Sequence, residues 1–212
     1  MTKRARIFIW ISVIILAAAG TIAGLYWYQL NTSSDAGAPA AVTVSTTQPD
    51  ETRPDPATYE WQGGPNDPKY INLPTIGAEG FMQNVGVDQE GAVAVPTNIH
   101  IAGWFIDSVL PGERGLSIVD GHVDGLTQDG IFQQLADLRQ GDEYTITMGD
   151  DTLKTFVVES VQTLPLEETA DVLYSQVPGV ERQLNLITCA GSFDRAVGQY
   201  DQRVVVVSAL KS

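Results

Sequence analysis

The sequence predicts a mostly β protein: one closed or nearly closed eight-stranded β-barrel with short helices, preceded by a single transmembrane helix. Eight short runs rich in Val, Ile, Thr and Phe recur between turn residues from about position 69 onward. A charge-free apolar stretch lies near the amino terminus. Hydrophobic residues make up 43% of the 212 residues, which is enough for a core, and the length fits one ordinary domain.

The elements of the barrel follow from the local patterns. A hairpin turn is expected at residues 149–151, where a glycine and two aspartates stand between two strand runs. Apolar residues at helical spacing predict short helices over 131–138 and 167–174. In chain order, the predicted strands are 71–76, 92–95, 100–105, 116–119, 143–148, 153–163, 183–189 and 203–210.

Residues 7–30 are the predicted transmembrane anchor. They contain no charge, and a helix of this length crosses a bilayer core of roughly 30 Å. Lys3, Arg4 and Arg6 precede the stretch, and all 26 acidic residues follow it. We therefore expect a cytoplasmic tail over 1–6 and an extracytoplasmic carboxyl-terminal part, as in a single-pass protein of the cell membrane. A cleaved signal peptide ending near residue 19 is the alternative.

Residues 31–68 predict an extended extracytoplasmic linker. They are rich in Asn, Thr, Ser, Asp, Ala and Pro, and five of the 11 prolines lie between positions 49 and 68. Such a segment has too little periodic apolar content to form a core of its own. Residues 69–212 remain for the barrel.

Composition excludes several kinds of site. Twelve basic residues against 26 acidic ones give a net charge of -14, and we expect no nucleic-acid partner because phosphate binding needs basic clusters. A single cysteine and two histidines leave no multi-cysteine or histidine-rich metal site. Residues 120–124 resemble part of a calcium loop, but its alternating aspartates and closing glutamate are missing. No metal or cofactor is predicted.

Cys189 is the first candidate for chemistry. It ends the alternating run 184–189, and Ala190 and Gly191 follow it, so a rigid strand would present the thiol beside a loop. A buried, inert thiol is the alternative. An unpaired thiol in an exported protein nevertheless risks oxidation. A nucleophilic cysteine needs a neighbouring imidazole or cation, because a free thiol is largely protonated near pH 7.

His122 and Arg203 are the candidates that would activate this thiol. His122 stands where a strand pattern runs into a glycine-flanked turn, whereas His100 alternates within an apolar run and is interpreted as a strand residue. Arg203 opens a run of four valines. If this strand paired with the cysteine strand, the guanidinium would lie near the thiol and stabilise an oxyanion. A surface charge at a strand end is the alternative.

These residues resemble the sortase family of membrane-anchored cysteine transpeptidases. Residues 186–189 match its Leu-x-Thr-Cys signature, with His122 67 residues before Cys189 and Arg203 14 residues after it. Residues 198–203 are similar to the Gly-x-aromatic-x-x-Arg approach to the sortase arginine strand. Residues 121–124 and 189–194 look most like class F sortases of actinobacteria. Class F chains often carry the arginine nearer the middle of the preceding loop, so Arg195 is the fallback.

The resemblance implies a sortase-like barrel and a transpeptidase mechanism without a cofactor. Cys189 would attack the Thr carbonyl of a sorting signal similar to LPXTG, His122 would protonate the leaving Gly amine, and Arg203 would stabilise the oxyanion. An amine of a peptidoglycan precursor would then resolve the acyl enzyme and attach the secreted protein to the cell wall.

The resemblance also implies supporting residues. The hydroxyl of Thr188 would support the oxyanion site. Leu164, Pro165 and Leu166 would line the groove that holds the sorting signal.

Two other functions remain open. A pilin-polymerising sortase uses a protein Lys as acceptor and often carries a lid before the barrel; the region of Asp55, Trp61, Asp67 and Pro68 shows no clear Asp-Pro-aromatic lid pattern. A membrane-tethered, non-catalytic β-barrel binding module is the second alternative. Papain-like enzymes place Cys before His, and L,D-transpeptidases carry a Ser-His-Gly-Cys motif, so neither fits.

Overall fold

The computed structural model describes residues 49–88, 91 and 93–211, all within the compact unit Ala40–Ser212. The predicted cytoplasmic tail, the transmembrane anchor and the first part of the linker lie outside these residues. Among the described residues, every helix is too short or too polar to cross a membrane.

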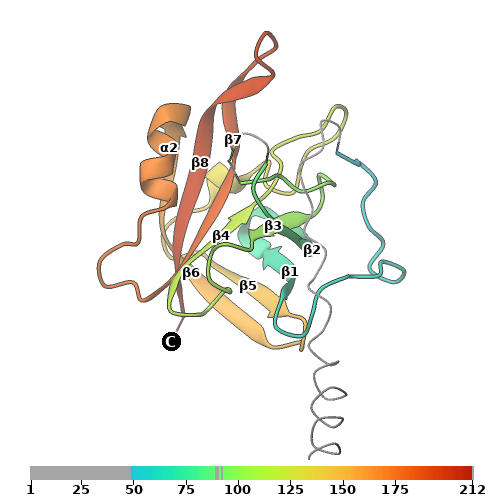
Figure 1. Cartoon of the computed structure of the whole chain (residues 1–212), viewed down its shortest axis with the longest axis vertical. Coiled ribbons are helices and arrows are strands. Elements are labelled where there is room, and N and C mark those ends of the chain that lie inside the picture. The colour runs from blue at the N-terminus through green and yellow to red at the C-terminus, as the bar shows by residue number, and fades with distance from the viewer. Residues whose placement is uncertain (1–48, 89–90, 92, 212) are drawn as a thin grey trace, which may run out of the picture. The chain divides into compact units, whose positions relative to one another are not determined.

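Eight strands close into a barrel (Figure 1), as the sequence predicts. Their order around the barrel is β1-β2-β3-β4-β7-β8-β6-β5, and β5 pairs with β1 to close it. The short helix α2, Leu166–Leu173, confirms the helix expected at 167–174. The strands are β1 Pro68–Leu73, β2 Ala78–Val85, β3 Ala102–Phe105, β4 Gly115–Asp120, β5 Glu143–Met148, β6 Leu153–Pro165, β7 Arg182–Asp194 and β8 Gln199–Leu210.

The pairing of β4 with β7 decides where the site forms. These two strands are parallel, as are β2 and β3, whereas the other strand pairs are antiparallel. Parallel strands end at the same rim of a sheet. In this register Asp120, the last residue of β4, lies opposite Ile187, two residues before Cys189. The residues that follow β4 therefore lie next to the cysteine.

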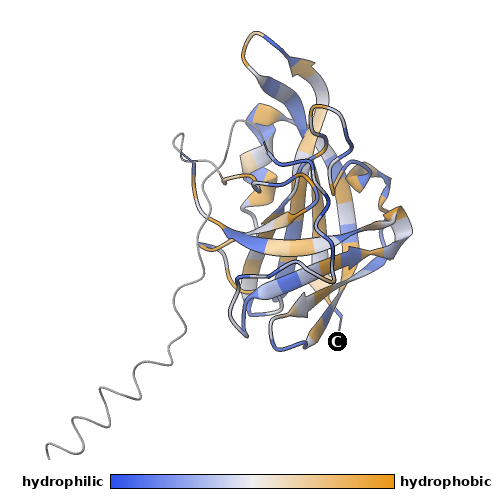
Figure 2. Cartoon of the chain, turned by 90° about the vertical axis from the view of Figure 1, so that its right-hand side faces the viewer, coloured by the Kyte–Doolittle hydropathy of each residue, from blue (hydrophilic) through white to orange (hydrophobic). Residues whose placement is uncertain are grey.

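Side chains along β4, β7 and β8 alternate between two apolar clusters, as the two faces of a strand require. Val119, Leu186 and Val206 belong to the interior of the barrel. Their chain neighbours Ile118, Ile187 and Val205 join Leu173 of α2 in a second cluster on the outer face. Because both faces are covered, β8 carries a continuous apolar run, residues 204–207, and Figure 2 shows hydrophobic and hydrophilic segments along the strands of the barrel. By the same alternation Asp120, Cys189 and Arg203 belong to the outer face.

The second strand is not where the sequence predicts it. We expected a strand at 92–95, but of the residues described there only Val93 makes a bridge, an isolated one to Val87. The second strand of the barrel is instead β2. Its polar residues Glu79, Gln83 and Asn84 interrupt the apolar pattern, so the sequence does not predict it. Glycine is required at position 80 because a Cβ there would lie 2.4 Å from the His100 carbonyl oxygen.

The segment 131–138 folds as turns and a one-turn 3-10 helix, η3 (Leu135–Asp137), rather than as the predicted longer helix. Its apolar residues are nevertheless buried in the barrel cluster: Ile131, Phe132, Leu135 and Leu138. The hairpin turn at 149–151 forms as expected, with Asp151 at a positive φ of 65° and the Met148 N–H bonded to the Thr152 carbonyl at 2.8 Å.

Residues 49–67 lie against the barrel, although we predicted an extended linker as far as residue 68. The Asp50 N–H donates to the Thr97 carbonyl at 2.8 Å, and the Trp61 indole N–H donates to the Met82 carbonyl at 2.8 Å. The rings of Tyr59 and Phe81 lie 4.4 Å apart, centroid to centroid. Aromatic side chains interrupt the prolines here and give the segment apolar surface to bury.

Candidate active site

Cys189 lies in the second half of β7, where this strand pairs with β8. The strand does not end at Cys189, where the sequence predicts its end, but continues to Asp194. In the antiparallel register Cys189 stands directly opposite Arg203. Directly opposed residues of an antiparallel pair share a face and have Cβ atoms about 5 Å apart. The thiol is half-buried and forms no disulfide. The predicted juxtaposition of Cys189 and Arg203 therefore occurs through strand pairing.

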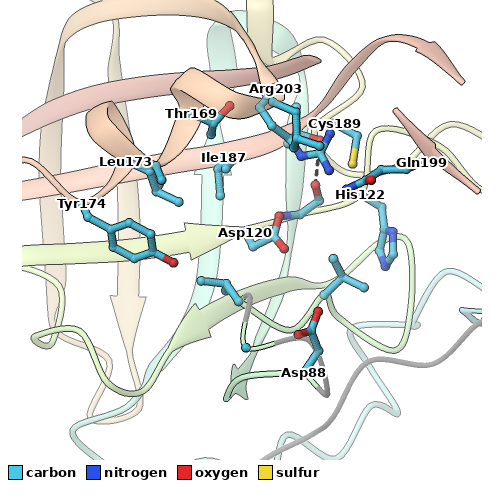
Figure 3. A pocket seen from close by; sticks show the side chains of 17 residues that line it. Asp88, Asp120, His122, Thr169, Leu173, Tyr174, Ile187, Cys189, Gln199 and Arg203 are labelled. Carbon is cyan, nitrogen blue, oxygen red and sulfur yellow. Dashed lines mark hydrogen bonds between the residues drawn. The ribbon is translucent and has the colours of Figure 1, made fainter. Parts of the chain in front are cut away.

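Both residues line a pocket of about 460 Å³ on the outer face of the barrel. We call this cavity the site pocket (Figure 3). Cys189, His122 and Gln199 stand toward one end, and Leu173 and Tyr174 of the α2 region toward the other. Asp120 stands between these two ends. The lining residues are Asp88, Gly91, Val93, Val95, Asp120, Gly121, His122, Leu166, Thr169, Ala170, Leu173, Tyr174, Ile187, Thr188, Cys189, Gln199 and Arg203.

His122 reaches the site pocket because β4 ends two residues before it. Gly121 lets the chain pass close to Phe132 at this point, since a Cβ there would lie 2.5 Å from the Phe132 ring. The imidazole Nε2 is 2.7 Å from the Pro96 carbonyl oxygen. A carbonyl only accepts, so Nε2 carries the proton and Nδ1 is the basic nitrogen of the neutral ring.

Thr188 ties the cysteine strand to the histidine segment. Its hydroxyl donates to the Gly121 carbonyl at 2.7 Å, and the side chain is buried. We expected this hydroxyl to support an oxyanion, but its one proton is already used in this bond. Thr188 therefore links the residue before Cys189 to the residue before His122.

Arg203, and not the fallback Arg195, lies in the site pocket. Its Nη1 donates to the carbonyls of Tyr200 at 3.0 Å and Gln202 at 2.8 Å, which fixes the orientation of the guanidinium. Arg195 is exposed in the turn between β7 and β8. The geometry thus supports Arg203 as the arginine of the site.

Of the three residues expected to line the groove, Leu166 lines the site pocket. Leu164 and Pro165 are the last residues of β6, where they pair with Arg203 and Gln202 of β8. Leu164 packs against the outer apolar cluster. These two residues support the β8 strand from outside the pocket.

Burial favours the neutral form of both the thiol and the imidazole. Burial raises the pKa of Cys189 to about 11; the Arg203 charge lowers it, and Asp120 and Asp124 raise it. Burial lowers the pKa of His122, against the opposing effects of the Pro96 carbonyl and Asp124. For the thiol to act as a nucleophile, a base such as the imidazole would have to take its proton.

Asp120 is a site residue that sequence reasoning missed. It is buried, and its carboxylate accepts a hydrogen bond of 2.6 Å from the Gly121 N–H. Burial raises its pKa to about 7, opposed by this hydrogen bond and by the Arg203 charge. The signal was present, because an acidic residue ends an apolar strand run two positions before His122. We had considered Asp120 only as part of a calcium loop.

Thr169, Tyr174 and Gln199 also line the site pocket and were not predicted. Thr169 lies on α2 and donates its hydroxyl to the Pro165 carbonyl at 3.0 Å. Nothing in the sequence pattern marks these residues. Thr169 and Tyr174 reach the pocket through the packing of α2 on the barrel, and Gln199 reaches it through the pairing of β8 with β7.

No group of three or more His, Cys, Asp or Glu residues among the described ones could hold a metal ion. Asp124 of the segment resembling a calcium loop instead accepts a hydrogen bond of 2.5 Å from the Tyr200 hydroxyl.

The fold is that of solved sortases. Sortase A from Corynebacterium diphtheriae superposes with a TM-score of 0.51 at 22% identity, over 71% of this chain and 64% of that one. Sortase C-1 from Actinomyces oris gives 0.50 at 24% identity, over 69% and 75%. Sortase C1 from Streptococcus agalactiae gives 0.52 at 21% identity, over 69% and 68%. The match thus spans less than two thirds of the Corynebacterium enzyme.

A family model for the sortase domain matches residues 71–211, so the chain belongs to the sortase family. Members of this family are typically cysteine transpeptidases. No curated protein matches the sequence.

Proposed function

We propose that this protein is a membrane-anchored cysteine transpeptidase that cleaves an LPXTG-like sorting signal between Thr and Gly. The acyl group passes to an amine of a peptidoglycan precursor, which attaches secreted proteins to the cell wall. One observation carries the proposal: Cys189, His122 and Arg203 line one pocket, with Cys189 and Arg203 opposite each other in the strand register. The residues compared with class F sortases support placement in that class.

The reaction begins with proton transfer from the Cys189 thiol to the His122 imidazole. The thiolate attacks the Thr carbonyl carbon, and the negative charge that forms on the oxygen is stabilised by the Arg203 guanidinium. The carbon–nitrogen bond to Gly then breaks, and His122 returns its proton to the departing amine. What remains is a thioester between the Thr carbonyl and Sγ.

The second half of the reaction resolves the thioester. An acceptor amine attacks the carbonyl carbon, His122 takes the proton that the amine loses, and the Cys189 thiolate departs. The same imidazole thus acts first as an acid and then as a base. Hydrolysis of the thioester by water is slower than aminolysis when the acceptor amine is bound in place.

The walls of the site pocket suit the apolar part of such a signal. Leu166, Leu173 and Ile187 supply apolar surface at the α2 side. Pockets of a few hundred Å³ bind a short peptide side chain mainly by excluding water from such walls. The scissile bond would then lie at the end that carries Cys189.

A pilin-polymerising role receives less support, because residues 49–67 do not line the site pocket. Arg53, Pro54 and Pro56 instead line a separate pocket with Tyr70, Phe81 and His100. The described residues that precede the barrel therefore provide no lid over Cys189.

The test uses the full chain in detergent with an LPXTG fluorescence-quenched peptide and hydroxylamine. We expect a threonine hydroxamate from the wild type and none from Cys189→Ala, while Ser192→Ala, an exposed neighbour on β7, keeps wild-type activity. Arg203→Lys should lower kcat at least tenfold and Arg195→Lys should not. No hydroxamate from the wild type, together with a thiol inert to alkylation, would favour the binding module.

A further inference from the structure

The segment before the barrel makes an ordered contact with the loop that follows His122. We call residues 49–59 the strap and residues 123–130 the histidine loop. Asp50 of the strap forms a parallel bridge to Asn98, with the Ile99 N–H donating to the Asp50 carbonyl at 2.9 Å. The Asn98 amide also donates to the Thr52 carbonyl at 2.8 Å. The strap is thus fixed to the barrel on both sides of Glu51.

Glu51 reaches from the strap into the histidine loop. Its carboxylate accepts hydrogen bonds from the Leu126 N–H, from the Thr127 N–H and from the Thr127 hydroxyl. Its main-chain carbonyl accepts from the Gln128 amide and from the His100 Nε2, both at 3.1 Å. The Thr127 hydroxyl and the two N–H groups lower the pKa of Glu51. The carboxylate is therefore ionised at neutral pH and is the acceptor for the tip of this loop.

The fit between Glu51 and the loop is close. A Cβ at Gly125 would lie 2.4 Å from Glu51 Oε1. Leu126 is 82% exposed, so the loop tip gains almost nothing from apolar packing. The hydrogen bonds that the loop donates to the Glu51 carboxylate are then the main contact that holds this tip on the strap side.

The base of the histidine loop is rigidly joined to His122. The Gly130 N–H donates to the Val123 carbonyl at 2.9 Å, and the Phe132 N–H donates to the His122 carbonyl at 3.0 Å. A Cβ at Gly130 would lie 2.3 Å from that same carbonyl oxygen. A displacement of the loop tip therefore reaches the backbone of His122.

The histidine loop is held on its other side by β8. Asp124 accepts the hydrogen bond from Tyr200 of β8, three residues before Arg203. The loop is consequently fixed between the strap and the strand that carries Arg203. These two contacts hold the loop that follows His122, while the bond from Nε2 to the Pro96 carbonyl holds the imidazole itself.

We propose that Glu51 is a positioning residue for the transpeptidase: through the strap it holds the histidine loop so that His122 stays in register with Cys189. The inference rests on the proposed function. It places the functional start of the catalytic unit at the strap rather than at β1.

The test compares Glu51→Ala and Glu51→Gln in the full chain, with Glu60→Ala as the matched control. Glu60 is an exposed glutamate close by in the same segment. We expect Glu51→Ala to lower kcat about tenfold with KM changed less than twofold, because the imidazole and not the peptide site is displaced. Glu51→Gln should recover at least half of the activity, since its amide oxygen still accepts from a main-chain N–H.

A second measurement does not depend on catalysis. Amide hydrogen exchange at Leu126 and Thr127 should become at least tenfold faster in Glu51→Ala and stay unchanged in Glu60→Ala. Wild-type kcat in Glu51→Ala, or an equal loss in Glu60→Ala, would overturn the proposal. If the wild type itself forms no hydroxamate, the proposed function fails; unchanged exchange in Glu51→Ala would then overturn the positioning contact separately.

Discussion

At the scale of single residues, the reactivity of Cys189 depends on the charges around it. Asp120 and Asp124 raise the pKa of the thiol, and Arg203 lowers it. The Arg203 charge alone would not activate the thiol, because burial raises the thiol pKa by more than this charge lowers it. In the proposed mechanism the imidazole removes the proton.

Alkylation of Cys189 by iodoacetamide should show these charges directly. With a thiol pKa of about 11, the rate should rise about tenfold per pH unit between pH 7 and 10. Asp120→Asn should increase the rate at pH 8 severalfold, and Arg203→Gln should decrease it. A pH-independent rate, or no difference between the two variants, would contradict this account.

Asp120 should also make stability depend on pH. Its pKa in the folded protein, about 7, lies above that of an unfolded Asp, about 3.9. The folded state therefore binds the proton more tightly, and the free energy of unfolding should fall as pH rises from about 4 to 7 and then level off. Asp120→Asn should remove this fall and be more stable than wild type at pH 8, by about 2 to 4 kcal/mol.

Thermal unfolding from pH 4 to 9 measures this effect. The control is Asp137→Asn, because Asp137 is exposed on η3. The same pH slope in wild type and Asp120→Asn would show that another group is responsible.

The candidate site residues could be found in the sequence as far as they belong to strands or strand ends. Cys189, His122 and Arg203 stand where an apolar alternation stops, and this pattern is visible without a structure. Asp120 also stands at a strand end, but the sequence pattern assigns it only to a segment that resembles a calcium loop. Thr169 lines the pocket because α2 packs on the barrel. The role of Glu51 depends on a contact across 75 residues of sequence, which no local pattern reveals.

At the scale of elements, the parallel pair β4 and β7 holds the site together. The pair ends in the bond from the Thr188 hydroxyl to the Gly121 carbonyl. This bond joins the two strands at the point where their hydrogen-bonded register stops and the site begins.

Thr188→Val should therefore weaken both stability and catalysis. Valine keeps the shape but leaves the Gly121 carbonyl without its buried partner, which costs about 1 to 3 kcal/mol. We expect a lower melting temperature and a lower kcat for hydroxamate formation. Thr163→Val, at an exposed position of β6, is the control; an equal effect there would show that the loss is not specific to this bond.

The strands could be predicted where β-branched residues cluster, as in β8 with its four consecutive valines. β2 was missed because Gly80 and its polar neighbours are selected by contacts with other parts of the barrel. The region 131–138 has helical spacing, but it folds as turns and η3, and its four apolar residues are buried in the barrel cluster. Tertiary packing, and not local propensity, decides such segments.

At the scale of the whole molecule, the amino-terminal anchor remains a prediction from sequence. We expect the full chain to sediment with membranes, and protease added from outside to release the barrel. A variant lacking residues 1–30 should be soluble and keep hydroxamate formation. Recovery of a mature protein that begins near residue 20 would instead identify a cleaved signal peptide.

The pairing of distant strands also affects how the chain acquires reactivity. His122 follows β4, Cys189 lies on β7 and Arg203 lies on β8. The sequence between β4 and β7 contains β5, β6 and α2, so His122 and Cys189 come from distant parts of the chain. Contacts of such long sequence separation form late and slowly in folding. During that delay Cys189 is an ordinary thiol without its imidazole or its guanidinium. If the proposed function holds, a partly folded chain is therefore unable to acylate itself with the wrong peptide. The topology thereby links nucleophilicity to the completion of folding.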